Sequence, residues 1–208
     1  MKKTLLITLF LGFMGTLMAQ NIKLPEPQKN KSTKSLMVLL NERQTSRNFS
    51  DKELSKQELS NILWAGFGYN KYGKRTAPSA ANKQEIDIYV ALKSGLYQYD
   101  AKENILIQIR KDDIRAKTGK QDFVKEAPIS LIYVADKKRM NPGDEIGTHG
   151  TLNIDCGFIS QNVYLYCTAM DYATVVRGGG INREELAKEM GLDNTYTIIV
   201  CQTIGYKK

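Results

Sequence analysis

The sequence has one histidine, His149, and only three cysteines among its 208 residues. No two cysteines form a C-x-x-C pair, and no cysteine stands beside the histidine. Because zinc is held by groups of Cys and His side chains, this scarcity argues against a zinc site. The sequence also shows no Ser-His-Asp set and no evident pair of acid/base carboxylates, so it points to neither hydrolytic arrangement.

The three cysteines offer no obvious disulfide. Cys156 and Cys167 fall in one long segment that we expect to be helical, where their spacing corresponds to roughly 16 Å along the axis. A disulfide needs Cα atoms within about 7 Å of each other. We therefore predict that these two residues and Cys201 are buried free thiols that pack as small apolar side chains.

Long apolar runs are few, and the first lies at the start of the chain. Leu5–Met18 follows Lys2 and Lys3 and ends just before Ala19, which is the layout of a secretory signal peptide with cleavage after Ala19. The alternative is a membrane anchor, but the run is shorter than the ~20 residues that span a bilayer. We predict that residues 1–19 are a signal peptide, that the protein is exported to the periplasm, and that no stable membrane span remains after cleavage.

The second apolar run covers residues 152–170. It is interrupted by Asn153, Asp155, Gln161 and Asn162, which a membrane span would not carry so readily. We expect a central buried helix here. The net charge of +8 is spread over the chain with acids between the basic residues, so a solvated basic surface is favoured over nucleic-acid binding.

The order of the expected elements indicates an α+β fold. Residues 20–34 hold two prolines and no periodicity and are predicted to be a flexible lead, followed by a single domain over 35–208. Capping patterns begin helices at Ser55, with Glu58, and at Asn182, with Glu185. Further helices are expected at 35–42 and 152–170, a polar loop at 137–148, and strands at 86–92, 95–99, 105–109, 129–134, 172–176 and 195–202. This order predicts a central, mostly antiparallel sheet flanked by helices, and the lack of G-x-G-x-x-G after a strand disfavours a dinucleotide-binding fold.

Three clusters carry residues suited to binding a ligand. In Arg43-Gln44-Thr45-Ser46-Arg47, two guanidinium groups with two hydroxyls between them can hold a phosphate; the alternative is an exposed polar turn. The loop 75–84 combines small residues with Pro78 and two amides, and can equally be an ordinary loop. The glycines of Val175–Gly180 can expose backbone N–H groups, or merely allow a tight connection with positive φ.

The order and spacing of these clusters resemble the nitroreductase superfamily of FMN proteins. The pattern Arg-x-Thr-x-Arg at 43–47 is followed by Pro-Ser-x-x-Asn-x-Gln at 78–84 and by VVRGG before a last strand ending in IGY. Glu85-Ile86 stands where the family usually has Pro-Trp. The stretches ILWAGFGYN and GLYQYD are most similar to the branch that contains the azoline-oxidising dehydrogenases of peptide maturation.

The resemblance implies FMN bound at the interface of a homodimer. Arg43, Gln44, Thr45 and Arg47 would hold the FMN phosphate and ribityl chain. The partner subunit would supply Pro78, Ser79, Ala80 and Asn82. Backbone N–H groups of Arg177 and Gly178 would face N5 of the flavin. Lys207 and Lys208 are the only basic residues available for the C-terminal phosphate contact common in the family.

The implied function is that of an FMN-dependent oxidoreductase. It would pass electrons by a ping-pong mechanism from a reduced small-molecule donor to a nitroaromatic, quinone or similar small acceptor. The alternatives are a flavin-dependent dehydrogenase or oxidase of a peptide or small molecule, a non-catalytic exported FMN-binding protein, and a structural protein with an empty site.

Overall fold

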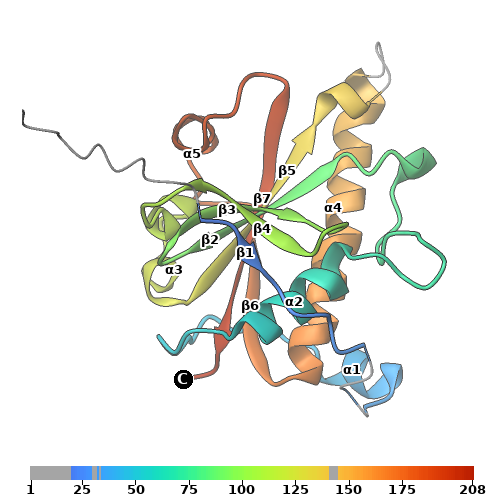
Figure 1. Cartoon of the computed structure of the whole chain (residues 1–208), viewed down its shortest axis with the longest axis vertical. Helices are drawn as coiled ribbons and strands as arrows, with labels where there is room; N and C mark the ends of the chain where they lie inside the picture. Colours follow the sequence, from blue (N-terminus) through green and yellow to red (C-terminus); the bar gives the residue numbers. More distant parts are fainter. Residues whose placement is uncertain (1–19, 30–31, 33, 141–144) are drawn as a thin grey trace, which may run out of the picture.

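The computed structural model describes residues 20–29, 32, 34–140 and 145–208, with side chains from Gly150 onward in the last range. The predicted signal peptide, residues 1–19, lies outside the described residues, as does the side chain of His149. The described part forms an antiparallel sheet of seven strands in the order β1-β4-β3-β2-β5-β7-β6, flanked by helices (Figure 1). The strands are β1 (Ile22–Lys23), β2 (Ile86–Leu92), β3 (Gly95–Asp100), β4 (Ile105–Arg110), β5 (Ile129–Asp136), β6 (Tyr172–Arg177) and β7 (Tyr196–Tyr206). The helices are α1 (Leu36–Glu42), α2 (Lys56–Phe67), α3 (Phe123–Glu126), α4 (Glu145–Ala169) and α5 (Arg183–Met190).

The sheet has helices on both faces because its central strands are apolar on both sides. In β2, Ile86, Ile88 and Val90 join the core formed with α2 and α4. Their neighbours Tyr89 and Ala91 join a second core with α5. All eight residues of β5 are buried, as its continuous apolar run predicts. Figure 1 shows α4 along one side of the sheet and α5 on the other. The predicted α+β fold is thus confirmed.

The predicted helix starts are confirmed. The Ser55 and Glu58 side chains each bond the other's backbone N–H at the start of α2. The Asn182 side chain accepts a hydrogen bond from the Glu185 N–H at the start of α5, which ends at Gly191 with φ of 69°. These contacts are local, so the sequence alone specifies them.

The flexible lead predicted for residues 20–34 is wrong for its first part. Ile22 and Lys23 form β1, which pairs with β4 at the edge of the sheet, and the next residue, Leu24, is buried. The carbonyl of Pro25 accepts hydrogen bonds from the side chains of Ser60 and Asn104. A two-residue strand is too short to produce a periodic pattern, and its partners lie far along the chain.

Two other boundaries differ from the prediction. Helix α4 begins at Glu145, so the polar loop expected up to residue 148 is shorter. Strand β7 continues past Gln202 to Tyr206 because β6 pairs with its whole second half. The three cysteines are free and buried, as predicted. Within the described ranges, no helix has both the length and the apolar character required to cross a membrane.

Helix α4 is not buried on all sides, contrary to the prediction of a central buried helix. Leu152, Cys156 and Ile159 pack into the core. On the opposite side, Ile154 is 58% exposed and Phe158 is 44% exposed. These two large apolar side chains are therefore open to solvent in the single chain.

Glu58 joins α2 to the last two strands. Its carboxylate accepts hydrogen bonds from the hydroxyls of Tyr172 in β6, at 2.7 Å, and Tyr206 in β7, at 2.6 Å. Burial tends to raise the pKa of Glu58, but the bonds from Tyr206, Tyr172 and Ser55 outweigh it and hold the pKa at about 2. The ionised form is therefore the one that the fold stabilises.

Replacing Glu58 by glutamine should destabilise the protein at neutral pH but not in acid. The folded pKa lies below the ordinary value of 4.5, so the contribution is present above that pH and is lost as the pH falls toward 2. Because the group is only partly buried, we expect a loss of about 1–2 kcal/mol in the free energy of unfolding. Urea unfolding at pH 7 and near pH 3 measures it, with the exposed Glu184→Gln as control. An equal gap at both pH values would contradict the prediction.

Candidate functional site

The segment Arg43–Arg47 lies directly after α1 and is held against β6 and α4. The Ser46 N–H donates to the Thr174 carbonyl at 3.0 Å. The Thr45 hydroxyl lies 3.0 Å from the hydroxyl of Tyr164 in α4, and the Arg43 guanidinium lies 5.4 Å from the centre of the Tyr164 ring. Tyr164 thus contacts two residues of the first predicted cluster, Arg43 and Thr45.

Tyr164 also connects this cluster to the end of β6. Its hydroxyl accepts a hydrogen bond of 3.0 Å from the Val176 N–H. Because that oxygen accepts from Val176, its own proton is free to be donated to Thr45. The first and third predicted clusters, Arg43–Arg47 and Val175–Gly180, are therefore brought together.

The two arginines at this place have no carboxylate partner among the described residues. Arg43 is half-buried, whereas Gln44, Thr45 and Arg47 are exposed. None of the ion pairs found in the described ranges involves Arg43 or Arg47. Two free guanidinium groups beside a hydroxyl are suited to a phosphate.

The second predicted cluster covers residues 75–84, and its loop of residues 78–84 is anchored to α4 at another point. The Ala80 N–H donates to Asp155 Oδ2 at 2.9 Å, and the Ser79 hydroxyl accepts from the Gln84 N–H at 2.9 Å. Pro78, Ala80 and Asn82 remain exposed.

This loop has an unusual backbone. Three of its residues adopt positive φ without being glycine: Ala81 at 49°, Asn82 at 54° and Gln84 at 51°. Such conformations persist only where surrounding contacts enforce them, and they concentrate at ligand sites.

Two arginines hold the far end of the loop. Arg75 Nε donates to Gln84 Oε1 at 2.9 Å, and Arg139 Nη1 donates to the Gln84 carbonyl at 2.7 Å. Burial lowers the pKa of Arg75, although nearby Tyr69 partly opposes this effect. Arg75, which the sequence places in the candidate ligand loop, thus holds that loop in its conformation.

Arg177 points away from the candidate site. Its side chain is 4% exposed, and its guanidinium bonds to Thr118, Ser130 and the Thr203 hydroxyl. Burial lowers its pKa. Its backbone pairs with Cys201 of β7, and because the Val176 N–H points away from β7 to Tyr164, the Arg177 N–H points toward β7. The predicted contact with a ligand therefore falls to Gly178.

The glycines after Arg177 leave room for a ligand. A Cβ at Gly179 would meet nothing within 4 Å, and one at Gly178 would meet only Val200, at 3.8 Å. Gly180 has φ of 73°, so the alternative explanation of a tight connection applies to that residue.

Two side chains that position the candidate site were not identified from the sequence. They are Tyr164, which holds Thr45, and Asp155, which holds Ala80. They stand nine positions apart on α4, which corresponds to about 13 Å along the axis. The one available signal was an acidic residue within an otherwise apolar helix, because such a residue usually has a specific partner.

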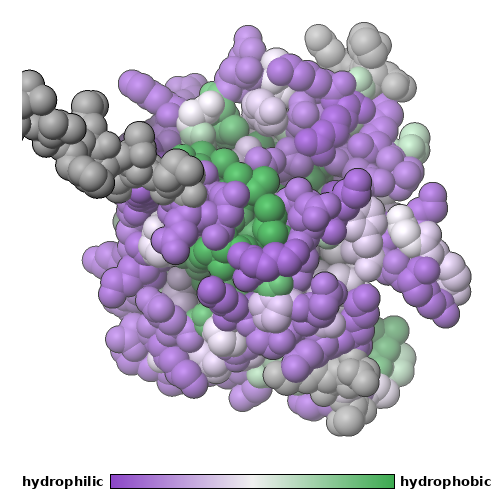
Figure 2. All heavy atoms as spheres, in the orientation of Figure 1, coloured by the Kyte–Doolittle hydropathy of each residue, from purple (hydrophilic) through white to green (hydrophobic). Residues whose placement is uncertain are grey.

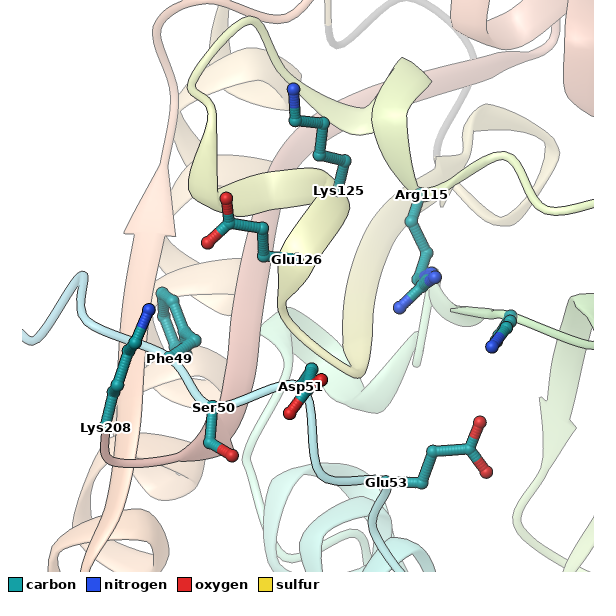
Figure 3. A pocket seen from close by; sticks show the side chains of 9 residues that line it. Phe49, Ser50, Asp51, Glu53, Arg115, Lys125, Glu126 and Lys208 are labelled. Carbon is teal, nitrogen blue, oxygen red and sulfur yellow. The ribbon is translucent and has the colours of Figure 1, made fainter.

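The two C-terminal lysines lie near other features. The Lys207 ammonium pairs with Asp171 and borders a cavity of about 260 Å³ together with Gln44 and Ser46. Lys208 lines a different, larger cavity of about 570 Å³, shown in Figure 3. That cavity mixes both charges, with carboxylates of Asp51, Glu53 and Glu126 among the basic groups of Lys93, Arg115, Lys125 and Lys208. It does not include the residues of the three clusters.

Comparison with known proteins identifies the family. The model of the nitroreductase family matches residues 40–206. A protein of Methanocaldococcus jannaschii that is provisionally named a nitroreductase is 29% identical over 176 residues, which is 78% of this chain and 86% of that one. The resemblance found in the three motifs is confirmed.

Solved structures agree. A provisionally named nitroreductase from Ralstonia eutropha shares 39% identity with a TM-score of 0.84 and covers 90% of both chains. A chain of the E. coli microcin synthetase complex, solved with truncated pro-MccB17, has the same fold, with a TM-score of 0.68 and 16% identity over 87% of this chain and 77% of that one. Within the described ranges, no group of His, Cys, Asp and Glu side chains is placed to hold a metal ion. The chain belongs to the nitroreductase family, whose members are oxidoreductases of the flavin type.

Proposed function

We propose that this protein is an FMN-dependent oxidoreductase that transfers electrons from a reduced small-molecule donor to a small acceptor such as a nitroaromatic or a quinone. The observation that carries the proposal is the joint contact of Arg43 and Thr45 with Tyr164, beside the glycines that follow β6. This arrangement offers a phosphate site next to a stretch of open backbone.

The residues present fit the cofactor. Arg43 and Arg47 supply the positive charge for a phosphate, and the hydroxyl of Thr45 adds a hydrogen bond. A flat ring can approach the backbone at Gly178 and Gly179, where no side chain intervenes. Bound FMN would supply the transfer of electrons at its N5 edge.

The chain's own groups would orient the ring and tune it. The N–H group of Gly178, if it faces the N5 edge, would bond to it, and positive charge near the ring favours its anionic reduced form. Donor and acceptor would use the same open face in turn, which corresponds to a ping-pong mechanism. The exposed loop residues Pro78, Ala80 and Asn82 would contact the flavin bound to the other subunit.

We further propose a homodimer in which the loop 78–84 serves the partner's flavin. Tyr164 and Asp155 anchor the two parts of the site at different heights of α4, and the exposed Phe158 lies between them. In a twofold dimer, a contact of residue i with residue j is repeated as j with i. Pairing α4 with its symmetry copy would therefore bring each loop toward the other chain's arginines.

Helix α1 adds to this apolar surface. Its Leu36, Met37 and Leu40 are exposed, with Met37 at 73%. Figure 2 shows apolar atoms at the lower right, where α1 lies near one end of α4. Exposed apolar groups on neighbouring helices are typical of a surface buried on assembly.

Export is the remaining part of the proposal, and it bears on the electron donor. The basic and apolar pattern of residues 1–19 is that of a signal peptide, which would place the mature protein in the periplasm. Because free NAD(P)H is a cytoplasmic pool, we propose another physiological reductant. Steady-state assays with NADPH, NADH and reduced quinones test this, and a strong selective preference for NADPH would count against it.

A second candidate is a dehydrogenase or oxidase of a peptide. The stretches ILWAGFGYN and GLYQYD support it, and the shared fold with the microcin synthetase chain is consistent with it.

Supplying FMN to the purified protein distinguishes an enzyme from a non-catalytic flavin-binding protein and from a protein with an empty site. Bound flavin that cycles supports an enzyme, bound flavin that never cycles supports a binding protein, and protein that stays colourless overturns the proposal.

A further inference from the structure

Glu85 carries a buried carboxyl group to which no other residue of the described part donates a hydrogen bond. It follows the loop 78–84 directly and precedes β2, and its side chain is fully buried. Among the described residues, neither of its side-chain oxygens accepts a hydrogen bond from another residue. A buried ionised carboxylate in that state would be costly.

The polar group that contacts Glu85 is a second carboxyl, that of Asp155 in α4. Asp155 is also buried, and its Oδ2 already accepts the Ala80 N–H of the loop. Two ionised carboxylates cannot bond each other, because both only accept. One proton held between them resolves this: Glu85 donates to Asp155, and Asp155 accepts from Ala80.

The charged groups nearby do not remove the need for that proton. The backbone N–H of Glu85 itself favours its ionisation, and Lys83 on the loop does so more weakly, but burial and Asp155 outweigh both. From the end of β5, Asp136 gives its backbone N–H to the Glu85 carbonyl. Arg139 is paired with Asp87 and Asp136.

Two further groups near the pair, Arg75 and Cys156, are engaged or neutral. Arg75, from the segment after α2, bonds to Gln84 and to the Phe67 carbonyl. On α4, the thiol of Cys156 has its pKa raised, chiefly by burial, so it stays neutral. Burial, followed by the hydrogen bond with Asp155, raises the pKa of Glu85 to about 7.

We propose that Glu85 and Asp155 are positioning residues that share one proton and thereby latch the loop 78–84 onto α4 in the conformation that receives the flavin. The three positive-φ residues of the loop need such an external hold. The latch rests on the proposed function for the identity of its ligand, but its effect on the loop does not.

The latch should depend on pH with a definite sign. Glu85 has an ordinary pKa of 4.5 when the loop is open and about 7 when it is latched. The latched form is therefore favoured most below pH 4.5, and that advantage is lost as the pH rises through 7. Above pH 8 the loop should open more often.

The test compares wild type with Glu85→Gln at pH 5.5 and 8.5. A glutamine amide can donate to Asp155 at every pH. Between pH 5.5 and pH 8.5, we expect the FMN affinity of the wild type to fall roughly tenfold more than that of the variant. Comparing the two proteins removes the effect of the FMN phosphate's own titration, because both experience it equally. Glu184→Gln, an exposed residue in α5, is the matched control and should follow the wild type.

A second readout needs no flavin. The rate of trypsin cleavage after Lys83, measured without FMN, reports how often the loop opens. At each pH, the rate for the wild type is divided by the rate for Glu85→Gln, because trypsin's own pH dependence affects both. We expect this ratio to rise several-fold at pH 8.5. If Glu85→Gln fails to fold, Asp155→Asn takes its place, because an asparagine can both accept from Ala80 and donate to Glu85.

The outcomes separate the two proposals. If neither the wild type nor the variants bind FMN but the cleavage ratio rises with pH, the proposed cofactor is wrong and the latch is supported. If FMN binds and both wild type and variant show parallel pH curves in both readouts, the latch is wrong.

Discussion

Replacing Arg43 by alanine should weaken FMN binding about 100-fold, the loss expected when a charge-assisted contact with a phosphate is removed. Arg43 is half-buried against the ring of Tyr164, so its guanidinium is held in place before the ligand arrives. It forms no ion pair within the described part of the chain, so no carboxylate of that part competes with a phosphate for it. Titration of flavin fluorescence measures the dissociation constant.

A graded series separates geometry from charge. Arg43→Lys keeps the charge but loses the planar fork of donors, so it should fall between wild type and Arg43→Ala. Lys111→Ala removes the same unit of charge at an exposed position after β4 and should bind FMN as the wild type does. If Lys111→Ala weakened binding as much as Arg43→Ala, general electrostatic attraction would account for both, and the specific phosphate site would be rejected.

The sequence predicts those features of the fold that neighbouring residues determine. The caps at Ser55 and Asn182 are formed by side chains that reach only three residues along the chain. The apolar run of β5 identifies a central strand because burial on both faces leaves no polar alternation. By contrast, β1 was missed because its stability comes from pairing with β4, more than 80 residues away in sequence.

The candidate site divides in the same way. The motifs at 43–47, 78–84 and 175–180 can be found from residue type and spacing. The residues that position them cannot, because Tyr164 meets Thr45 across 119 positions and Asp155 meets Ala80 across 75. Glu85 was noted in the sequence only as a departure from the family's usual Pro-Trp, and its burial beside another carboxyl appears only in three dimensions.

Replacing Phe158 by aspartate should dissociate the proposed homodimer and release FMN together. Phe158 is 44% exposed on the side of α4 that faces away from the sheet. Full burial of a phenylalanine contributes about 1.5–3 kcal/mol, of which a little under half remains to be gained at an interface, and a twofold interface loses it twice, so dimer affinity should fall by about 10- to 100-fold. A buried unpaired carboxylate adds to the loss.

The coupled loss of FMN is the part that tests the architecture. If the partner's loop 78–84 completes each site, a monomer keeps Arg43 and Arg47 but lacks half of the enclosure, and it should bind flavin weakly. Sedimentation velocity and flavin absorbance measured on the same sample follow both quantities.

Ile109→Asp provides the matched control. Ile109 is exposed to nearly the same degree, 41%, but it lies on β4. That strand is near the opposite end of the sheet from β6. It should leave both assembly and flavin binding intact, because a new charge on a surface open to water costs little. A monomeric Phe158→Asp protein that retained FMN at wild-type affinity would show that one chain builds the whole site. In that case one bound flavin would reach both the part of the site held by Tyr164 and the part held by Asp155, nine residues apart on α4. No second subunit would then be needed to complete the site.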